Sequence, residues 1–264
     1  LKFKVLKVIK NDIYLKAENS GQLKSSKGIN IPYVNLTGKL ITQRDKKIIA
    51  FAKSKEVDFI GISFVESAKH INLIRKLINK ETPKIIAKIE NQKGIDNLKE
   101  ILKATDIIMI DRGDLSTETN IESLAINQKN IIKLANELSK PVIVATEMLD
   151  NMISSPNPTK AEVLDISNSI VDGATATMLS GETAIGKYPV ESIKVMSKIS
   201  SVIINNEDVN KKNIIKPASE TIGMANTIKY LSYSLPITKI VAITISGYAA
   251  RIVSSQMLSQ PIIA

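Results

Sequence analysis

The sequence predicts an α/β fold that forms part of a (β/α)8 TIM barrel, and three observations lead to this prediction. From residue 43 onward, strand-like segments alternate regularly with amphipathic, helix-like segments. The strand-like segments are short and rich in Ile, Val or Met, which is typical of βα units. Polar residues gather where these segments end. An open doubly wound sheet shares the first two features. The polar strand ends favour the barrel, which places its active site there.

Composition limits the classes of function. A chain of 264 residues with 44% hydrophobic content can bury a sizeable core. No apolar run approaches the roughly 18 residues that cross a bilayer, so no membrane partner is expected. Because the chain has no Cys, any metal must be held by oxygen atoms or by the single His70. That donor set favours a hard cation such as Mg²⁺.

The net charge of +10 raises the possibility of nucleic-acid binding. The lysines, however, are spread through predicted helices and loops, with only 4% aromatic residues and no recognition motif. No nucleic-acid partner is therefore expected. A positive field would still favour an anionic substrate such as a phosphorylated acid.

The first element is a short β-hairpin from Phe3 to Leu15, because apolar residues alternate on both sides of a polar break at residues 10–12. It is too small to stand alone. Five predicted strands follow: Asp58–Phe64, Lys84–Glu90, Thr105–Asp111, Pro141–Thr146 and Ala174–Leu179.

Amphipathic helices lie between these strands, so the segment contains five βα units. One apolar face comprises Ile71, Ile74, Leu77 and Ile78, and another comprises Ile131, Leu134, Ala135 and Leu138. A barrel needs about eight units, so about three strands are expected ahead of Leu1.

A second domain is expected after the last barrel helix, which ends near Ile204. The polar stretch NNEDVNKKN that follows resembles a linker. Beyond it the pattern predicts a helix from Ile222 to Leu231, a strand from Ile240 to Ile245, a helix from Tyr248 to Leu258 and the beginning of another strand. This is a truncated α/β domain.

The strand PKIIAKIEN carries the first candidate site residues. Its period of two places Lys88 and Glu90 on one side and Ile85, Ala87 and Ile89 on the other, towards the helices. A solvated ion pair is the plain alternative and would contribute under about 1 kcal/mol. A charged pair on an apolar strand is costly unless it is used or well paired, which favours a functional role.

The next strand ends in IIMIDRGDLS and delivers Asp111, Arg112 and Asp114 around a glycine that lets the backbone turn. Glu90 and Asp114, from neighbouring strands, could share one Mg²⁺ through oxygen. At the following strand ends lie Thr146 and the run from Ser180 to Thr183. Hydroxyls and glycines there suit an anionic ligand, and helix capping explains them equally well.

Seven stretches of the chain resemble pyruvate kinase in their order and spacing. They are LKSSKGINIP, DFIGISFVESAKHINLIR, IIAKIENQKGIDNLKEI, DIIMIDRGDL, KPVIVATEML, SPNPTKAEVLDISNSIVDGATATMLSGETAIGKYPVES and IVAITISGYAARIV. The KIEN and MLSGETA blocks are the most specific. The resemblance implies that residues 1–24 are the tail of an inserted β domain, residues 25–205 are barrel units four to eight, and residues 206–264 begin a C-terminal three-layer α/β domain.

The resemblance also implies an activity, namely phosphoryl transfer from phosphoenolpyruvate to ADP with Mg²⁺ and, in the full-length protein, K⁺. Lys88 would neutralise the transferring phosphoryl group, and Glu90 and Asp114 would bind the Mg²⁺. The amides of Gly113 and Asp114, with the Thr146 hydroxyl, would hold the substrate carboxylate. The remaining implied residues are Ser63 and Phe64, Ser180 and Glu182 of the last active-site loop, and Thr244, Ser246 and Gly247 of an effector loop.

Several positions depart from the family pattern. Asp111 stands where the family usually has Ala, and Glu147 stands where it has Gln or Asn. Glu66, Ser116 and Ile185 replace a usual Arg, a usual Gly and a polar or basic residue. Most of these changes make the site more acidic, which would weaken the binding of an anionic substrate.

The family's first three strands, with further substrate and cation ligands, are not among these residues, so the 264-residue chain alone is expected to be inactive. Two other interpretations remain: a degenerate, non-catalytic relative, and another Mg²⁺-dependent barrel enzyme of the enolpyruvate or aldol type. The KIEN and MLSGETA blocks argue against the latter. The resemblance further implies a homotetramer when full length. A cytoplasmic location is the default expectation, with an organelle-targeted form as the alternative.

Overall fold

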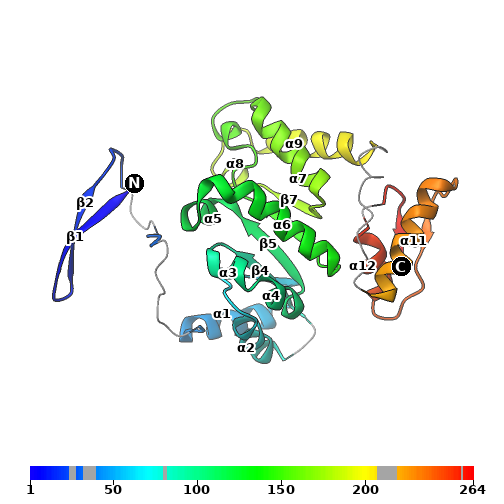
Figure 1. Cartoon of the computed structure of the whole chain (residues 1–264), viewed down its shortest axis with the longest axis horizontal. Helices are drawn as coiled ribbons and strands as arrows, with labels where there is room; N and C mark the ends of the chain where they lie inside the picture. Colours follow the sequence, from blue (N-terminus) through cyan, green and yellow to red (C-terminus); the bar gives the residue numbers. More distant parts are fainter. Residues whose placement is uncertain (24–27, 32–39, 80–81, 207–218, 257) are drawn as a thin grey trace. The chain divides into compact units, whose positions relative to one another are not determined.

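The computed structural model describes residues 1–23, 28–31, 40–79, 82–206, 219–256 and 258–264. The chain separates into two compact units, Leu1–Ile31 and Pro32–Ala264, and the second contains most of the secondary structure (Figure 1). The predicted linker falls mainly within residues 207–218, which lie outside the described residues.

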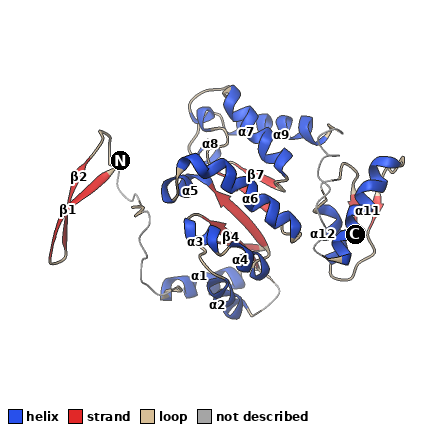
Figure 2. Cartoon of the chain, viewed as in Figure 1, coloured by secondary structure: helices blue, strands red, loops and turns tan. Residues whose placement is uncertain are grey.

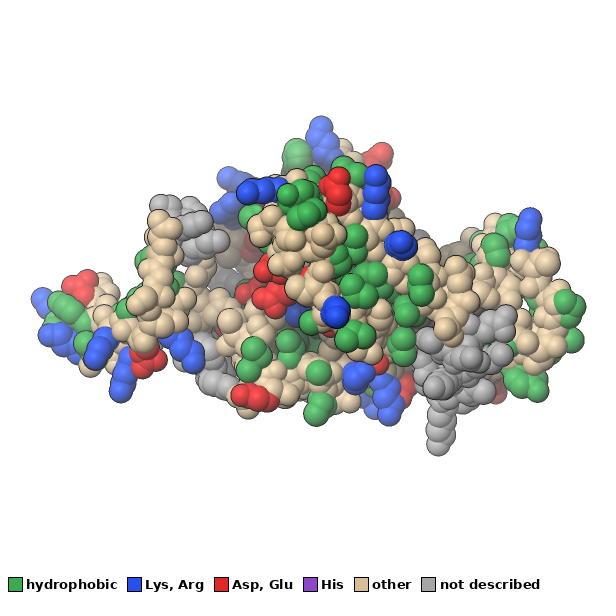
Figure 3. Space-filling model, turned by 90° about the horizontal axis from the view of Figure 1, so that it is seen from above, with side chains coloured by type: hydrophobic (Ala, Val, Ile, Leu, Met, Phe, Trp, Pro, Cys, Tyr) green, Lys and Arg blue, Asp and Glu red, His purple; other side chains and the backbone are tan. Residues whose placement is uncertain are grey.

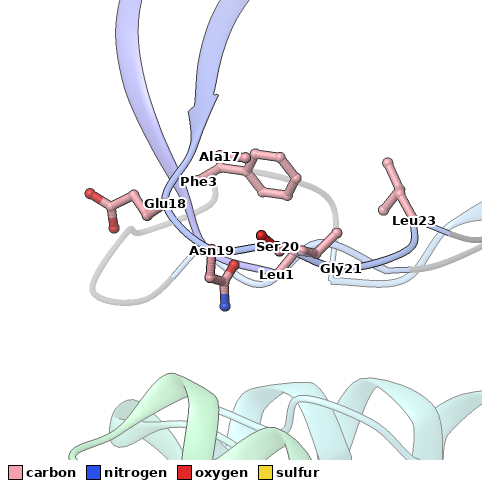
Figure 4. A pocket seen from close by; sticks show the side chains of 8 residues that line it. All are labelled: Leu1, Phe3, Ala17, Glu18, Asn19, Ser20, Gly21 and Leu23. Carbon is pink, nitrogen blue, oxygen red and sulfur yellow. The ribbon is translucent and has the colours of Figure 1, made fainter.

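The first unit holds the predicted hairpin. Strand β1 (Phe3–Ile9) pairs antiparallel with β2 (Asp12–Ala17), two residues longer than predicted, and the turn passes through Lys10 with a φ of 50°. Every residue of both strands is exposed. Figure 4 shows an open hollow at the end of the hairpin, lined by Leu1, Phe3 and residues 17–21 and 23. It includes none of the candidate site residues.

The second unit is built on a parallel sheet whose strand order, β3-β4-β5-β6-β7, follows the order of the chain. Each strand lies within a predicted one: β3 (Phe59–Ile62), β4 (Lys84–Ile89), β5 (Ile107–Asp111), β6 (Val142–Ala145) and β7 (Ala176–Met178). All neighbouring pairs are parallel. A doubly wound sheet reverses its strand order at a switch point, whereas a barrel does not. The five strands therefore have the arrangement of consecutive barrel units.

Helices connect the strands and pack against the sheet (Figures 1 and 2). Their bounds are α1 (Gln43–Ser54), α2 (Ala68–Ile78), α3 (Gln92–Asp96), α4 (Leu98–Ala104), α5 (Arg112–Glu118), η1 (Ile121–Ser123), α6 (Leu124–Glu137), η2 (Asp150–Ile153), α7 (Lys160–Asp172), α8 (Gly181–Ala184) and α9 (Pro189–Ile204). The predicted apolar faces are in the core, because Ile71, Ile74, Ile78, Ile131 and Ala135 are all buried.

Local sequence explains where helix α7 begins and ends. Thr159 accepts a hydrogen bond from the amide of Glu162, and the Glu162 side chain accepts one from the amide of Thr159. This capping box satisfies amides that the helix cannot satisfy itself. At the other end Gly173 adopts a φ of 108°, a left-handed conformation that favours glycine.

Strand β4 has the alternation that the sequence predicts. Ile85, Ala87 and Ile89 are completely buried among the helices, while Lys84, Ile86 and Lys88 are half-buried on the opposite side. The strand thus inserts one face into the core and presents Lys88 on the other. Glu90 follows directly after the strand, so both charged residues lie at the carboxyl edge of the sheet.

Residues 219–264 form a smaller α/β segment. Helix α11 (Glu220–Ser234), strand β8 (Ile240–Val241), helix α12 (Tyr248–Ser254) and strand β9 (Ile262–Ile263) follow one another, and β8 pairs parallel with β9. Two sequence predictions were too long. The strand expected to reach Ile245 ends at Val241, because Ile243 and Ile245 are fully exposed and have no neighbouring strand among the described residues. The helix expected to reach Leu258 ends at Ser254.

Candidate active site

The candidate residues meet at one edge of the parallel sheet. Ser63, Glu90, Asp111 and Thr146 each stand at or just beyond the end of β3, β4, β5 and β6 respectively. Since these strands are parallel and in register, their carboxyl ends lie side by side. The sheet therefore delivers a hydroxyl, two carboxylates and a second hydroxyl around Lys88.

Lys88 is the centre of this group. Its Nζ lies 2.6 Å from Glu90 Oε1 and 2.9 Å from Asp111 Oδ2. It also donates to Ser63 Oγ at 3.3 Å. Burial alone would lower the pKa of Lys88, but the hydrogen bonds and charges of Glu90 and Asp111 outweigh it, and the pKa is raised. The ammonium is therefore retained at neutral pH.

Glu90 is almost completely buried, with 1% of its surface exposed. Burial raises the pKa of its carboxyl more than Lys88 and the Phe64 amide lower it. The amide of Phe64, a residue with a φ of 50°, donates to Glu90 Oε2. The other oxygen, Oε1, is buried and paired with the Lys88 ammonium at 2.6 Å. A positive charge thus already lies against this oxygen.

Three carboxylates can meet at a single point. One oxygen each from Glu90, Asp111 and Asp114 can be chosen so that all lie within 4.8 Å of one another. Hard cations prefer oxygen donors and carboxylates in particular. The donor set and the buried Glu90 oxygen thus fit Mg²⁺. The predicted ligands Glu90 and Asp114 are brought together, and Asp111 joins them.

Thr146 connects the ends of β5 and β6. Its Oγ1 accepts a hydrogen bond from the Gly113 amide at 2.8 Å, and as a donor it has two acceptors in reach, the Ala145 carbonyl at 2.6 Å and Asp111 Oδ1 at 3.2 Å. Thr146 has a φ of 69° and Glu147 a φ of 54°, so the chain makes an unusual turn here. The amide and hydroxyl predicted to hold a carboxylate are therefore adjacent.

Arg112 secures that turn, and the sequence did not predict this role. Its guanidinium is buried, donates to the Thr146 carbonyl at 2.7 and 3.1 Å and to the Glu147 carbonyl at 2.8 Å. The same group pairs with Asp165 of α7 at 2.5 Å. No sequence signal links Arg112 to Asp165, because the two are 53 residues apart and on different elements.

We expect replacement of Arg112 by Lys to destabilise the protein by about 2 kcal/mol or more, because one ammonium cannot reproduce the forked donors that bind two carbonyls and a carboxylate. Denaturant unfolding measures the effect. The matched control is Arg75→Lys, whose side chain is more exposed and contacts Asp106 and one carbonyl. Equal losses from both variants would contradict the role assigned to Arg112.

Ser180 follows β7, Glu182 lies in the short helix α8 that begins there, and the structure gives Glu182 a local task. Its two carboxylate oxygens accept hydrogen bonds from the amides of Leu149 at 2.9 Å and Ser180 at 2.8 Å. This buried carboxylate ties the loop after β7 to the one after β6. The substrate-binding role of Ser180 and Glu182 stays a prediction.

The other departures from the family pattern lie around this centre. Glu66 accepts hydrogen bonds from Asn91 at 2.8 Å and from Lys93 at 3.3 Å, and Ser116 donates to the Gly113 carbonyl at 3.0 Å. Glu147 and Ile185 are exposed. Of the five departures, Asp111 alone contacts Lys88 among the described residues.

The predicted effector residues Thr244, Ser246 and Gly247 share the loop between β8 and α12. Gly247 has a φ of 72° where the helix begins, a conformation that suits glycine. Their effector role stays a prediction.

Charge on the surface is unevenly placed. On the face seen in Figure 3, Lys and Arg side chains are dispersed, whereas a group of acidic side chains lies near the centre.

Within the described part of the chain, no helix combines the length and apolar content that membrane crossing requires.

Comparison with known proteins gives one consistent family. The family model described as "Pyruvate kinase, barrel domain" matches residues 1–193. A pyruvate kinase of Bacillus licheniformis is 41% identical over 97% of this chain and 45% of its own length. One of Clostridium perfringens is 40% identical over 100% of this chain and 58% of its own. One of Thermotoga maritima is 40% identical over 92% and 53%. The chain thus spans about half the length of these relatives.

Proposed function

This chain belongs to the pyruvate kinase family, and on that premise we propose that its full-length protein transfers the phosphoryl group of phosphoenolpyruvate to ADP, giving pyruvate and ATP. The observation that carries the proposal is the placement of Lys88 beside three convergent carboxylates at the carboxyl edge of the sheet. Phosphoryl transfer depends on positioning and on positive charge near the moving group. The site supplies both.

Each residue has a separate task in this proposal. Lys88, kept protonated by its acidic neighbours, would turn towards the transferring phosphoryl group and stabilise its charge. Ser63, 3.3 Å from Lys88 Nζ, would guide that side chain. The substrate carboxylate would replace Thr146 Oγ1 as the acceptor of the Gly113 amide and would then accept from the Thr146 hydroxyl. Ser180 and Glu182 would shape the far side of the substrate site.

Glu90 and Asp114 would hold the Mg²⁺ in this proposal. When bound, the ion supplies positive charge that favours the transfer. The buried Glu90 Oε1, which already holds the positive charge of Lys88 at 2.6 Å, supports this assignment. K⁺ and the remaining ligands for ADP would come from other parts of the full-length protein, as would the contacts of a homotetramer.

The domain assignment is also a proposal. Residues 1–24 would complete an inserted β domain, residues 25–205 would be barrel units four to eight, and residues 206–264 would begin the C-terminal α/β domain. The fully exposed hairpin supports a larger β domain, because a two-stranded hairpin is marginal alone. Thr244, Ser246 and Gly247 would belong to an effector site in the C-terminal domain, and the protein would act in the cytoplasm.

Turnover by the full-length protein tests the proposal. We expect pyruvate to form from phosphoenolpyruvate and ADP in the presence of Mg²⁺, and chelation of the metal to stop the reaction. A coupled spectrophotometric assay measures the product. Absence of turnover at saturating substrates and Mg²⁺ would instead support a non-catalytic relative, in which the Asp111–Lys88 contact blocks the phosphoryl position.

A further inference from the structure

Asp111 has a place in the site that the family pattern does not provide. It closes β5 opposite Ala145 of β6, and its carboxylate is 11% exposed. One oxygen lies 2.9 Å from Lys88 Nζ, and the other accepts from the Thr146 hydroxyl at 3.2 Å. Asp111 therefore contacts both residues proposed to handle the substrate.

The contacts of Lys88 identify a point that attracts cations. Its ammonium lies 2.6 Å from Glu90 Oε1 and 2.9 Å from Asp111 Oδ2, so these two carboxylates converge on one position. Glu90 Oε1 is buried, and its close partner is this ammonium, so a positive charge already lies against it. Asp114 offers a third oxygen within 4.8 Å of the other two. The Lys88 ammonium therefore lies where a bound cation would contact the same carboxylates.

The balance of charge also differs from that of a two-carboxylate site. Glu90, Asp111 and Asp114 carry three negative charges against the one positive charge of Lys88. A divalent cation would neutralise the cluster, whereas with an uncharged residue at position 111 the same ion would leave a positive excess. Asp111 thus favours the cation and disfavours an anionic substrate in the same place.

We infer that Asp111 is a third carboxylate ligand of the divalent-cation site, so that this protein binds the cation tightly before the anionic substrate arrives. The inference rests on the proposed function, because it adds a ligand to the site assigned there. Glu90, Asp111 and Asp114 would hold the cation, and Lys88, no longer needed to balance the charge of its two carboxylate partners, would be free to turn towards the phosphoryl group. Asp111 is then a ligand that strengthens cation binding and weakens substrate binding.

Binding of Mn²⁺ to the substrate-free full-length protein tests this inference without relying on turnover. Titration followed by electron paramagnetic resonance gives the Kd for wild type, Asp111→Asn, Asp111→Ala and Glu90→Gln. We expect both Asp111 variants to weaken Mn²⁺ binding by about ten- to a hundredfold. Asp96→Asn is the matched control, because Asp96 is exposed and bonds Gln92 on the same helix. Circular dichroism checks that each variant is folded.

A second titration, with phosphoenolpyruvate but neither ADP nor a divalent cation, should show the opposite change, with Asp111→Ala binding the substrate several-fold more tightly. If Glu90→Gln weakens Mn²⁺ binding and the Asp111 variants do not, the metal site stands and Asp111 is not its ligand. If Asp111→Ala weakens the binding of both ligands, Asp111 only positions Lys88 and Thr146, and the inference is wrong. If wild type binds no Mn²⁺, both the inference and the proposed metal site fail.

Discussion

Replacing Lys88 with Met in the full-length protein should reduce turnover by about two to three orders of magnitude while leaving the protein folded. Lys88 pairs with Glu90 and Asp111, and its removal leaves the transferring phosphoryl group without that stabilising charge. The same change should leave Mn²⁺ binding as tight as in wild type or tighter, because the competing ammonium is gone.

Steady-state kinetics and Mn²⁺ titration together check this prediction. Lys103→Met is a suitable control, since Lys103 is exposed in the last turn of α4. If Lys88→Met keeps most of its turnover, Lys88 does not stabilise the transferring phosphoryl group. A variant that loses Mn²⁺ binding would show instead that Lys88 organises the metal ligands.

Replacing Glu90 with Gln should have the complementary effect. The substitution keeps the shape and the oxygen that accepts from the Phe64 amide but removes the charge that faces Lys88 and the cation. We expect divalent-cation binding to weaken by at least about a hundredfold and turnover at moderate Mg²⁺ to fall accordingly. Added Mg²⁺ should restore part of the activity, which it cannot do for Lys88→Met.

The measurements are the Mg²⁺ dependence of turnover and the Kd for Mn²⁺. Glu122→Gln, at an exposed position, controls for the loss of one negative charge. Unchanged cation affinity in Glu90→Gln would contradict the assignment of Glu90 as a ligand. Lys88 and Glu90 lie two residues apart at the end of β4. Loss of cation binding in Glu90→Gln, but not in Lys88→Met, would therefore assign metal binding to Glu90 and stabilisation of the phosphoryl group to Lys88.

The strands and the polar strand ends could be predicted because each depends on local pattern. Alternation along PKIIAKIEN places Lys88 and Glu90 away from the core, and the five strands lie where apolar runs predict them. The segment after residue 218 was harder to predict. The apolar run that follows Ile240 has the composition of a longer strand, but Ile243 and Ile245 find no neighbouring strand among the described residues.

The parts of the site that escaped prediction depend on contacts between distant elements. Asp111 could be recognised as unusual, but its contact with Lys88 depends on the register of β4 and β5, which one sequence does not give. The sequence places Arg112 at the end of a strand but does not indicate its partners. These are the carbonyls of Thr146 and Glu147, which become available because both residues adopt a left-handed backbone conformation. Backbone turns of this kind follow from tertiary packing more than from residue type.

The alternating burial of β4 has a consequence for how this gene can vary in length. Loss or gain of one codon inside the strand would exchange its two faces and place the lysine ammonium among Ile101, Ile108 and other helix and strand residues of the core. Such a change would disrupt both the packing of the core and the placement of Lys88 in the candidate site. Exposed connections have no such alternation of faces, so insertions tolerated by selection should accumulate there and spare β4.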